Sequence, residues 1–364
     1  MRRARISVFV TMLILISIGV VMIYSASSIP VWEASGQSYG LLKKQLFYVL
    51  LGFLGMGLAM AIDYHDLKKW AKPLLVVSLV PLVLVLVPGI SHEAGGAKRW
   101  LHVFGFNYQP TEFVKLTLII YLADYIVRKS RYLKNFWKGF VPPMMTLGAI
   151  TLLVLLQPDL GTTVALVVLT FVMLYVSGIR AAHLAASVLA ALPFLYILVF
   201  SVSYRRSRIL AFLNPWLDPQ GSGFQIIQSQ IALASGGIFG VGLGQSRQKL
   251  FYLPAAHADF IFSIISEELG LIGAVAVILL FIFLIWQMAR IIRHVSDSFG
   301  KLICIGVLTL IAFSAVVNIG VSIGSLPTKG LPLPFISYGG SSLVFLMMSV
   351  GLFLNVSKSE EKLL

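Results

Sequence analysis

The chain has 364 residues, of which 58% are hydrophobic and only 12% charged, and its mean hydropathy is +0.93. Soluble domains carry roughly 25% charged residues, so this composition excludes the soluble globular classes and requires the bilayer as solvent for much of the surface. The net charge of +14 comes from short Lys and Arg clusters between apolar runs, which is a pattern of membrane topology and argues against a nucleic-acid partner.

The first predicted element is a membrane span. Arg2, Arg3 and Arg5 precede an apolar stretch of near twenty residues, 6–24. A cleaved signal peptide has a shorter apolar region, and many similar runs follow here. We therefore interpret the stretch as a retained first span.

The remaining apolar runs predict an all-α polytopic membrane protein, with about ten transmembrane helices in a single domain of residues 1–364. The approximate spans, in chain order, are 6–25, 45–62, 73–89, 111–128, 140–156, 160–178, 184–202, 260–288, 302–325 and 338–356.

The distribution of basic residues predicts the orientation. With the N-terminus inside, seventeen of the 28 Lys and Arg residues fall in inner segments and five in short outer loops. Basic residues concentrate on the cytoplasmic side of membrane proteins. Both termini are therefore expected in the cytoplasm, and the large loop 203–258, between spans seven and eight, is expected on the outer face.

The large outer loop is too ordered in composition to be a flexible linker. Turn-forming residues crowd the segment 214–224, and 236–244 is rich in glycine, which allows close packing or bending. Between them, 225–233 has the pattern of a short amphipathic helix, which we expect to lie on the membrane.

The strongest local signal for chemistry is Asp259, where the outer loop enters span eight. A carboxylate at that interface loses part of its hydration, which raises its pKa and suits a general base. The alternative is a helix N-cap, a position that Asp prefers. Nearby His257 is read either as a catalytic group or as a structural hydrogen-bonding residue.

Outer basic residues form the second signal. They are Arg205, Arg206 and Arg208 at the start of the large loop, and Lys98 and Arg99 between spans three and four. Guanidinium groups suit diphosphate oxygens, whereas contact with lipid headgroups is the alternative. Because basic clusters on the outer face run against the usual bias, an anionic ligand is expected.

Charged residues within or beside spans form the third signal. Glu112 and Lys115 lie three residues apart and can pair; each costs roughly 2.5–3.5 kcal/mol at mid-bilayer if left alone. Asp159 lies in the outer turn between spans five and six, and Glu267 with Glu268 lies in span eight. These groups serve either as structural pairs between helices or as an ion or proton path.

Several sequence segments resemble the SEDS family (shape, elongation, division and sporulation) over nearly the whole chain. The segments that carry the resemblance are 98–100 (KRW), 109–115 (QPTEFVK), 157–161 (QPDLG), 212–229, 235–237 (SGG) and 333–342 (LPFISYGGSS). The segments 214–216 (NPW), 223–225 (GFQ), 242–249 (GLGQSRQK) and 252–254 (YLP) resemble the division branch more than the elongation branch.

The resemblance implies a peptidoglycan glycosyltransferase. Such enzymes polymerise lipid II on the outer face of the cytoplasmic membrane, invert the sugar carbon and release undecaprenyl diphosphate. Asp259 matches the family's essential carboxylate. The outer cations are then expected to neutralise the diphosphate together with Mg²⁺ or Mn²⁺. The further residues that the matched segments place at the substrate are Gln228, Ser229, Lys249 and His257.

The resemblance also implies partners and a location. These are a class B penicillin-binding transpeptidase, divisome regulators, membrane lipids and the undecaprenyl-linked glycan, at the division septum. Ala255 and Ala258 depart from the family, which usually has a glutamate and a threonine there. Three alternatives stay open: a flippase that uses Glu112, Lys115 and Glu267 as its path, a scaffold that recruits the transpeptidase, and an elongation-type polymerase.

Overall fold

The computed structural model describes residues 1–35, 39–89, 91–94, 97–103, 106–249, 253, 257–328 and 330–363. Its α-helices are α1 Arg2–Ser35, α2 Gly40–Ala61, α3 Leu67–Leu84, α4 Pro110–Arg128, α5 Val141–Leu156, α6 Leu160–Val176, α7 Ala181–Phe200, α8 Ser203–Leu213, α9 Phe224–Ser235, α10 Ile261–Ile292, α11 Ser298–Ser322 and α12 Ser341–Leu363. Short 3₁₀ turns occupy Tyr64–Asp66, Ser130–Tyr132 and Pro215–Leu217, and a π-turn occupies Phe136–Phe140.

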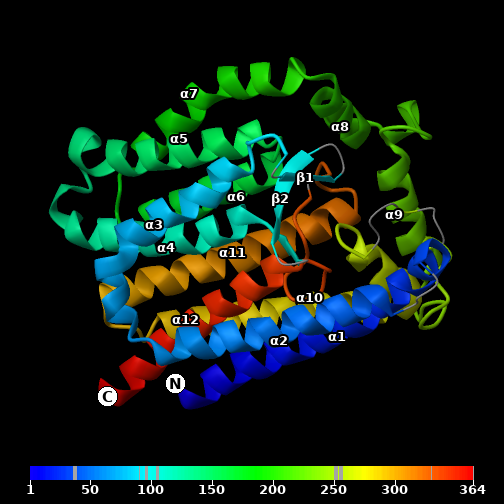
Figure 1. The fold of residues 1–364 in the computed structure, drawn as a ribbon, viewed down its shortest axis with the longest axis horizontal. Helices are drawn as coiled ribbons and strands as arrows, with labels where there is room; N and C mark the ends of the chain where they lie inside the picture. The colour runs from blue at the N-terminus through cyan, green and yellow to red at the C-terminus, as the bar shows by residue number, and fades with distance from the viewer. Residues whose placement is uncertain are drawn as a thin grey trace.

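The helices form a bundle whose long members lie side by side (Figure 1). Within the described residues, six helical segments are long and apolar enough to cross a bilayer: Arg2–Ser27, Gly40–Ala61, Phe136–Leu156, Ile261–Ile292, Ser298–Ser322 and Ser341–Glu360. Two shorter apolar segments lie in α6 and α7. The predicted multi-pass membrane class is therefore confirmed.

The two chain termini lie at one end of the bundle, and the strands, α8 and α9 lie at the other (Figure 1). α4 and α11 are mostly buried and pack against each other in the interior. α2 packs along α12, α1 along α10, and α3 along α4. Apolar side chains that remain exposed on the outer helices, such as Leu58, Leu152 and Leu279, suit contact with lipid tails.

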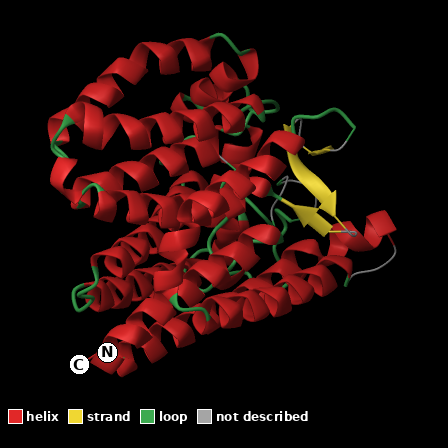
Figure 2. Ribbon diagram, turned by 60° about the vertical axis from the view of Figure 1, so that its left-hand side comes forward, coloured by secondary structure: helices red, strands yellow, loops and turns green. Residues whose placement is uncertain are grey.

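A small antiparallel sheet joins α3 to α4, an addition to the all-α architecture that the sequence did not predict. Its strands, in spatial order, are β1 Ser91–Ala94, β2 Ala97–Val103 and β3 Phe106–Tyr108. Figure 2 shows it at one end of the helical bundle. The strands are too short and too polar to give the alternating pattern that reveals strands in sequence. The sheet matters because β2 carries Lys98 and Arg99.

The predicted helix at 225–233 is present as α9, and α8 adds a second helix to the large loop. The predicted span 260–288 corresponds to α10, which is broken at Gly270, whose φ is 67° and ψ −166°. The glycine-rich segment 236–242 pairs with the broken backbone. Leu271 N donates to Gly237 O at 2.9 Å, and Val241 N donates to Glu267 O at 3.0 Å. Non-helical backbone at membrane depth needs such partners.

Candidate active site

Asp259 lies in a turn just before α10, and it does not cap that helix. The residue at the N-cap position is Phe260, and the structure gives no side-chain cap there. The backbone carbonyl of Asp259 accepts a hydrogen bond from Asn318 Nδ2 at 2.9 Å, whereas no described residue donates to its carboxylate. The N-cap alternative was therefore wrong, and the carboxylate is left available for a ligand.

The surroundings of Asp259 perturb its ionisation. Burial is the largest cause and raises the pKa of Asp259 above its ordinary value. The positive charges of Arg208 and then Arg99 lower the pKa, and the negative charge of Asp159 raises it. Three charged groups from separate parts of the chain therefore act on the carboxyl group of Asp259, and a carboxyl group perturbed in this way is a candidate general base.

Arg99 and Asp159 lie close together. Arg99 Nε is 3.9 Å from Asp159 Oδ2, and its guanidinium donates to the carbonyls of Gln157, at 3.3 Å, and Pro158, at 2.5 Å. Asp159 also caps α6, since its carboxylate accepts from Thr162 N at 3.0 Å. Arg99 therefore has a structural role beside its electrostatic effect on Asp259. The side chain of Lys98 lies outside the described residues.

The three arginines of α8 differ in their surroundings. Arg208 lines a cavity of about 230 Å³ together with Gln225 and Thr328, and its Nη1 donates to Thr328 O at 3.4 Å. Arg206 is exposed and Arg205 is half-buried. The positive charge of Arg208 acts on Asp259.

Three more residues were predicted at the substrate: Ser229, Gln228 and His257. Ser229 is fully buried, and its hydroxyl donates to Ser322 O at 2.7 Å and contacts Ser263 Oγ at 2.6 Å, so it joins α9 to α10 and α11. Gln228 is half-buried on α9. Burial lowers the pKa of His257, which keeps its ring neutral near pH 7, and the ring meets Tyr338 edge-on at 5.8 Å.

Lys249 lies in a buried network rather than beside a ligand. Its ammonium is 2.9 Å from Glu268 Oε1 and 3.1 Å from Ser25 Oγ, and the residue is 3% exposed. Ser25 Oγ also donates to Glu268, at 2.6 Å. The prediction that Lys249 binds substrate thus disagrees with its surroundings, because its charge is neutralised inside the protein.

Glu267 belongs to the same network. Its carboxylate accepts hydrogen bonds from Ser246 Oγ and, at 3.0 Å, from Arg247 N. Glu267 and Glu268 therefore hold the end of the large loop against α10. This arrangement supports the structural-pair interpretation, with loop residues and Ser25 as the partners.

We expect Lys249→Met to destabilise the protein by about 3 kcal/mol, because it leaves the carboxylate of Glu268 buried without its cation. Lys249→Met combined with Glu268→Gln should recover at least half of that loss. Thermal unfolding in detergent measures both values. Lys43→Met is the control, since Lys43 is exposed; a loss equal to that of the control would show that the ion pair contributes nothing.

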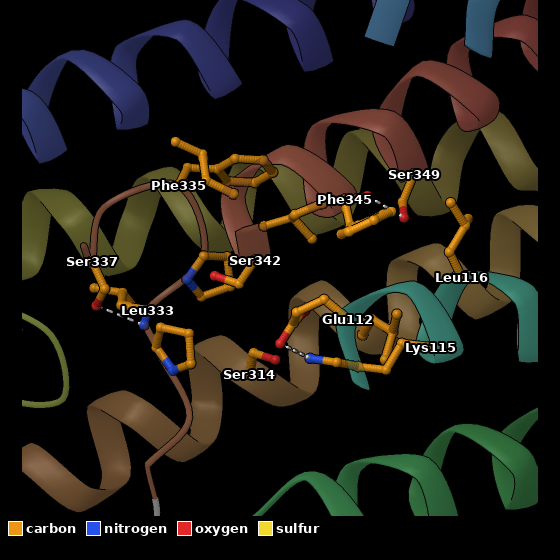
Figure 3. Close-up of a pocket in the computed structure, with 15 residues that line it drawn as sticks. Glu112, Lys115, Leu116, Ser314, Leu333, Phe335, Ser337, Ser342, Phe345 and Ser349 are labelled. Carbon is orange, nitrogen blue, oxygen red and sulfur yellow. Dashed lines mark hydrogen bonds and ion pairs between the residues drawn. The ribbon is translucent and has the colours of Figure 1, made fainter. Parts of the chain in front are cut away.

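Glu112 and Lys115 form the predicted ion pair, with Lys115 Nζ 2.8 Å from Glu112 Oε1. The pair lines a cavity of about 40 Å³ (Figure 3). Ser314, Leu333 and Ser337 also line this cavity. The two charges satisfy each other, so the pair needs no transported ion to explain it.

The chemistry of the donor atoms bears on the predicted Mg²⁺ or Mn²⁺. Among the described residues, no three His, Cys, Asp or Glu side chains converge on one point. A site built from protein ligands alone therefore does not fit this part of the chain. Ala258 supplies no side-chain ligand, and Ala255 lies outside the described residues. The divalent cation stays a prediction.

A helical membrane bundle with a desolvated carboxyl group under the influence of two arginines defines a multi-pass membrane protein with a candidate acid–base site. The chain belongs to the FtsW/RodA/SpoVE family of cell cycle proteins, which it matches over residues 5–362. The resemblance inferred from sequence segments is thereby confirmed.

Named relatives cover nearly the whole chain. A probable peptidoglycan glycosyltransferase FtsW from Geobacter sp. (strain M18) is 47% identical over 94% of each chain. Stage V sporulation protein E of Bacillus subtilis (strain 168) is 44% identical over 95% of this chain and 94% of its own length.

Solved structures share the fold. One, from work on a peptidoglycan synthase complex that coordinates polymerisation and crosslinking, has a TM-score of 0.81 at 31% identity and covers 97% of each chain. Rod shape determining protein RodA of Thermus thermophilus has a TM-score of 0.72 at 28% identity and covers 97% of this chain and 96% of its own.

Proposed function

We propose that this protein is a peptidoglycan glycosyltransferase that polymerises lipid II on the outer face of the cytoplasmic membrane and releases undecaprenyl diphosphate. The observation that carries the proposal is the carboxylate of Asp259, desolvated, free of hydrogen bonds from described residues and influenced by Arg208 and Arg99. The names of the relatives, peptidoglycan glycosyltransferase FtsW among them, support the same activity.

In the proposed reaction Asp259 acts as general base. It takes the proton from the acceptor sugar hydroxyl while that oxygen forms a bond to the donor's anomeric carbon. The bond between that carbon and the diphosphate oxygen breaks on the opposite face, which inverts the carbon, and the diphosphate leaves with the electron pair. Arg208 stabilises the negative charge that develops on it, with Arg205 and Arg206 on the same helix.

The topology that suits this reaction has ten spans, α1–α7 and α10–α12, with both termini in the cytoplasm and 203–258 outside. The common position of the termini and the strands at the opposite end support it (Figure 1). In α10, the 22 residues after the break extend about 33 Å, which is enough to cross a hydrocarbon core of about 30 Å. Glu267 and Glu268 then lie near the outer boundary, not at mid-membrane.

The relatives favour a division role at the septum over an elongation role, because the first matches bear the name FtsW. The structural neighbour described within a synthase complex supports a crosslinking partner. A class B penicillin-binding transpeptidase is the proposed partner, with divisome regulators beside it and Mg²⁺ or Mn²⁺ as the proposed cation.

The activity should depend on the ionisation of Asp259. Because Asp259 works only when deprotonated, kcat/KM falls as the pH drops through its pKa, and that fall occurs above the ordinary range for Asp. Arg208 lowers this pKa, so Arg208→Gln should move the acidic limb of the pH profile to higher pH. Rates of polymerisation between pH 4 and pH 9 measure the shift. If the acidic limb stayed at the same pH, the charge of Arg208 would not lower the pKa of Asp259.

The decisive test supplies purified protein, with and without a class B transpeptidase, with labelled lipid II and Mg²⁺ or Mn²⁺. Glycan ladders on a gel are the expected result. Vesicles with lipid II in one leaflet test the flippase in parallel. Movement of lipid II between leaflets without glycan ladders would reject the polymerase hypothesis and support the flippase hypothesis. Transpeptidase stimulation without either activity from this chain would favour the scaffold.

A further inference from the structure

Three consecutive backbone carbonyls in the Asp259 turn are each held by a donor from elsewhere in the fold. His257 O accepts from Tyr338 N at 3.0 Å, Ala258 O from Ser337 Oγ at 2.6 Å, and Asp259 O from Asn318 Nδ2 at 2.9 Å. The donors come from α11 and from the segment 331–340 before α12, which are remote from the turn in sequence.

These bonds restrain the backbone from which the Asp259 side chain extends. Each peptide unit is planar and rigid, so a hydrogen bond that holds its carbonyl restrains the orientation of the whole unit. The units that end in the carbonyls of Ala258 and Asp259 flank the Cα of Asp259. Holding both units therefore restrains φ and ψ at Asp259, and with them the direction of its Cα–Cβ bond.

The donors are themselves held firmly. Asn318 is 1% exposed and uses both hydrogens of its amide nitrogen, on Asp259 O and, at 2.9 Å, on Leu331 O. Ser337 is 3% exposed, and its hydroxyl accepts from Leu333 N at 2.8 Å while it donates to Ala258 O. Figure 3 shows the bond between Ser337 and Leu333 on the wall of the cavity beside Glu112 and Lys115.

We propose that Asn318 and Ser337 are positioning residues that orient the carboxylate of Asp259 for proton abstraction. This inference rests on the proposed function. A base acts only at hydrogen-bond distance from the proton it removes, and a displacement of about 1 Å from the productive geometry costs on the order of 10²-fold in rate. Neither residue touches the reacting atoms in this account.

The test compares Asn318→Asp and Ser337→Ala with wild type in the polymerisation assay. Asn318→Asp keeps the size of the side chain but replaces the donor with a carboxylate facing two carbonyls. Each variant should lower kcat by roughly 10- to 100-fold and leave KM for lipid II within about twofold. Ser337→Thr keeps the hydroxyl and should restore kcat to within about threefold of wild type.

The control is Ser27→Ala, which removes a buried hydroxyl that donates to Ile23 O at 2.7 Å within α1. It should change neither kcat nor KM. A positioning role is overturned if Asn318→Asp and Ser337→Ala keep the kcat of wild type, or if Ser337→Thr is as slow as Ser337→Ala.

A second measurement is independent of activity. Hydrogen–deuterium exchange at the amide of Tyr338, which donates to His257 O, should be at least about tenfold faster in Ser337→Ala than in wild type, because the turn opens more often. Equal exchange would overturn the proposal even if the protein polymerised nothing. Absence of ladders from wild type and all variants would instead reject the proposed function, so the two failures remain distinct.

Discussion

Asp259→Asn should lower the polymerisation rate about 10²- to 10⁴-fold, the range of a general base. The amide has the size of the carboxyl group but cannot accept the proton. Asn318 binds the backbone of Asp259 and not its side chain, so the turn should persist. Because the buried carboxylate is costly to ionise, the variant should melt at the same temperature as wild type or higher. Initial rates of glycan formation measure the effect.

Two further variants complete this experiment. Asp259→Glu keeps the acid on a longer stem and should retain a small part of the activity. Asp66→Asn changes an exposed carboxylate that pairs with Lys69 and lies far from Asp259 in the sequence, and it should leave the rate unchanged. If Asp259→Asn made glycan ladders at the rate of wild type, Asp259 would not be the general base.

Gly270→Ala should destabilise the protein by about 4 kcal/mol, because backbone strain and overpacking each cost about 1–3 kcal/mol. The backbone of Gly270, at φ 67° and ψ −166°, lies in a region open essentially to glycine alone. A Cβ there would also overlap the nitrogen of Gly240 and the carbonyl of Ile238. The yield of monodisperse protein and its unfolding temperature in detergent are the measurements.

The matched control for this prediction is Gly57→Ala in α2. A Cβ at Gly57 meets nothing within 4 Å, and alanine favours a helix over glycine by about 0.8–1.0 kcal/mol. Gly57→Ala should therefore leave the protein as stable as wild type or slightly more so. If Gly270→Ala matched this control, the break in α10 would not depend on glycine.

Hydrophobic runs and charge spacing predicted much of the fold. Long apolar runs are strong signals because every span must supply its own backbone hydrogen bonds. The pair Glu112–Lys115 follows from helical spacing alone, since residues three apart face each other. Asp259 was located because a single carboxylate stands at the start of a long apolar run.

Three of the features that escaped prediction depend on partners distant in sequence. Lys249 was expected at the substrate, but it meets Ser25, which is 224 residues away. Asn318 gave no signal of its own, because one amide in an apolar helix does not reveal which carbonyl it binds. Ser337 stood within a recognised family segment, yet its contact with Ala258 spans 79 residues. Local patterns carry no information about such contacts.

The backbone pairing between 236–242 and the break in α10 has a consequence for engineering. The carbonyls of Gly237 and Ile238 in the loop accept hydrogen bonds from the helix after its break. In the other direction, loop amides donate to the carbonyls of Glu267 and Glu268. The two stretches therefore behave as one interlocked module. A chimera that takes this loop from a homologue without the matching part of α10 would leave backbone amide and carbonyl groups without hydrogen-bond partners. Exchanges between family members should therefore transfer the loop and the broken part of α10 together.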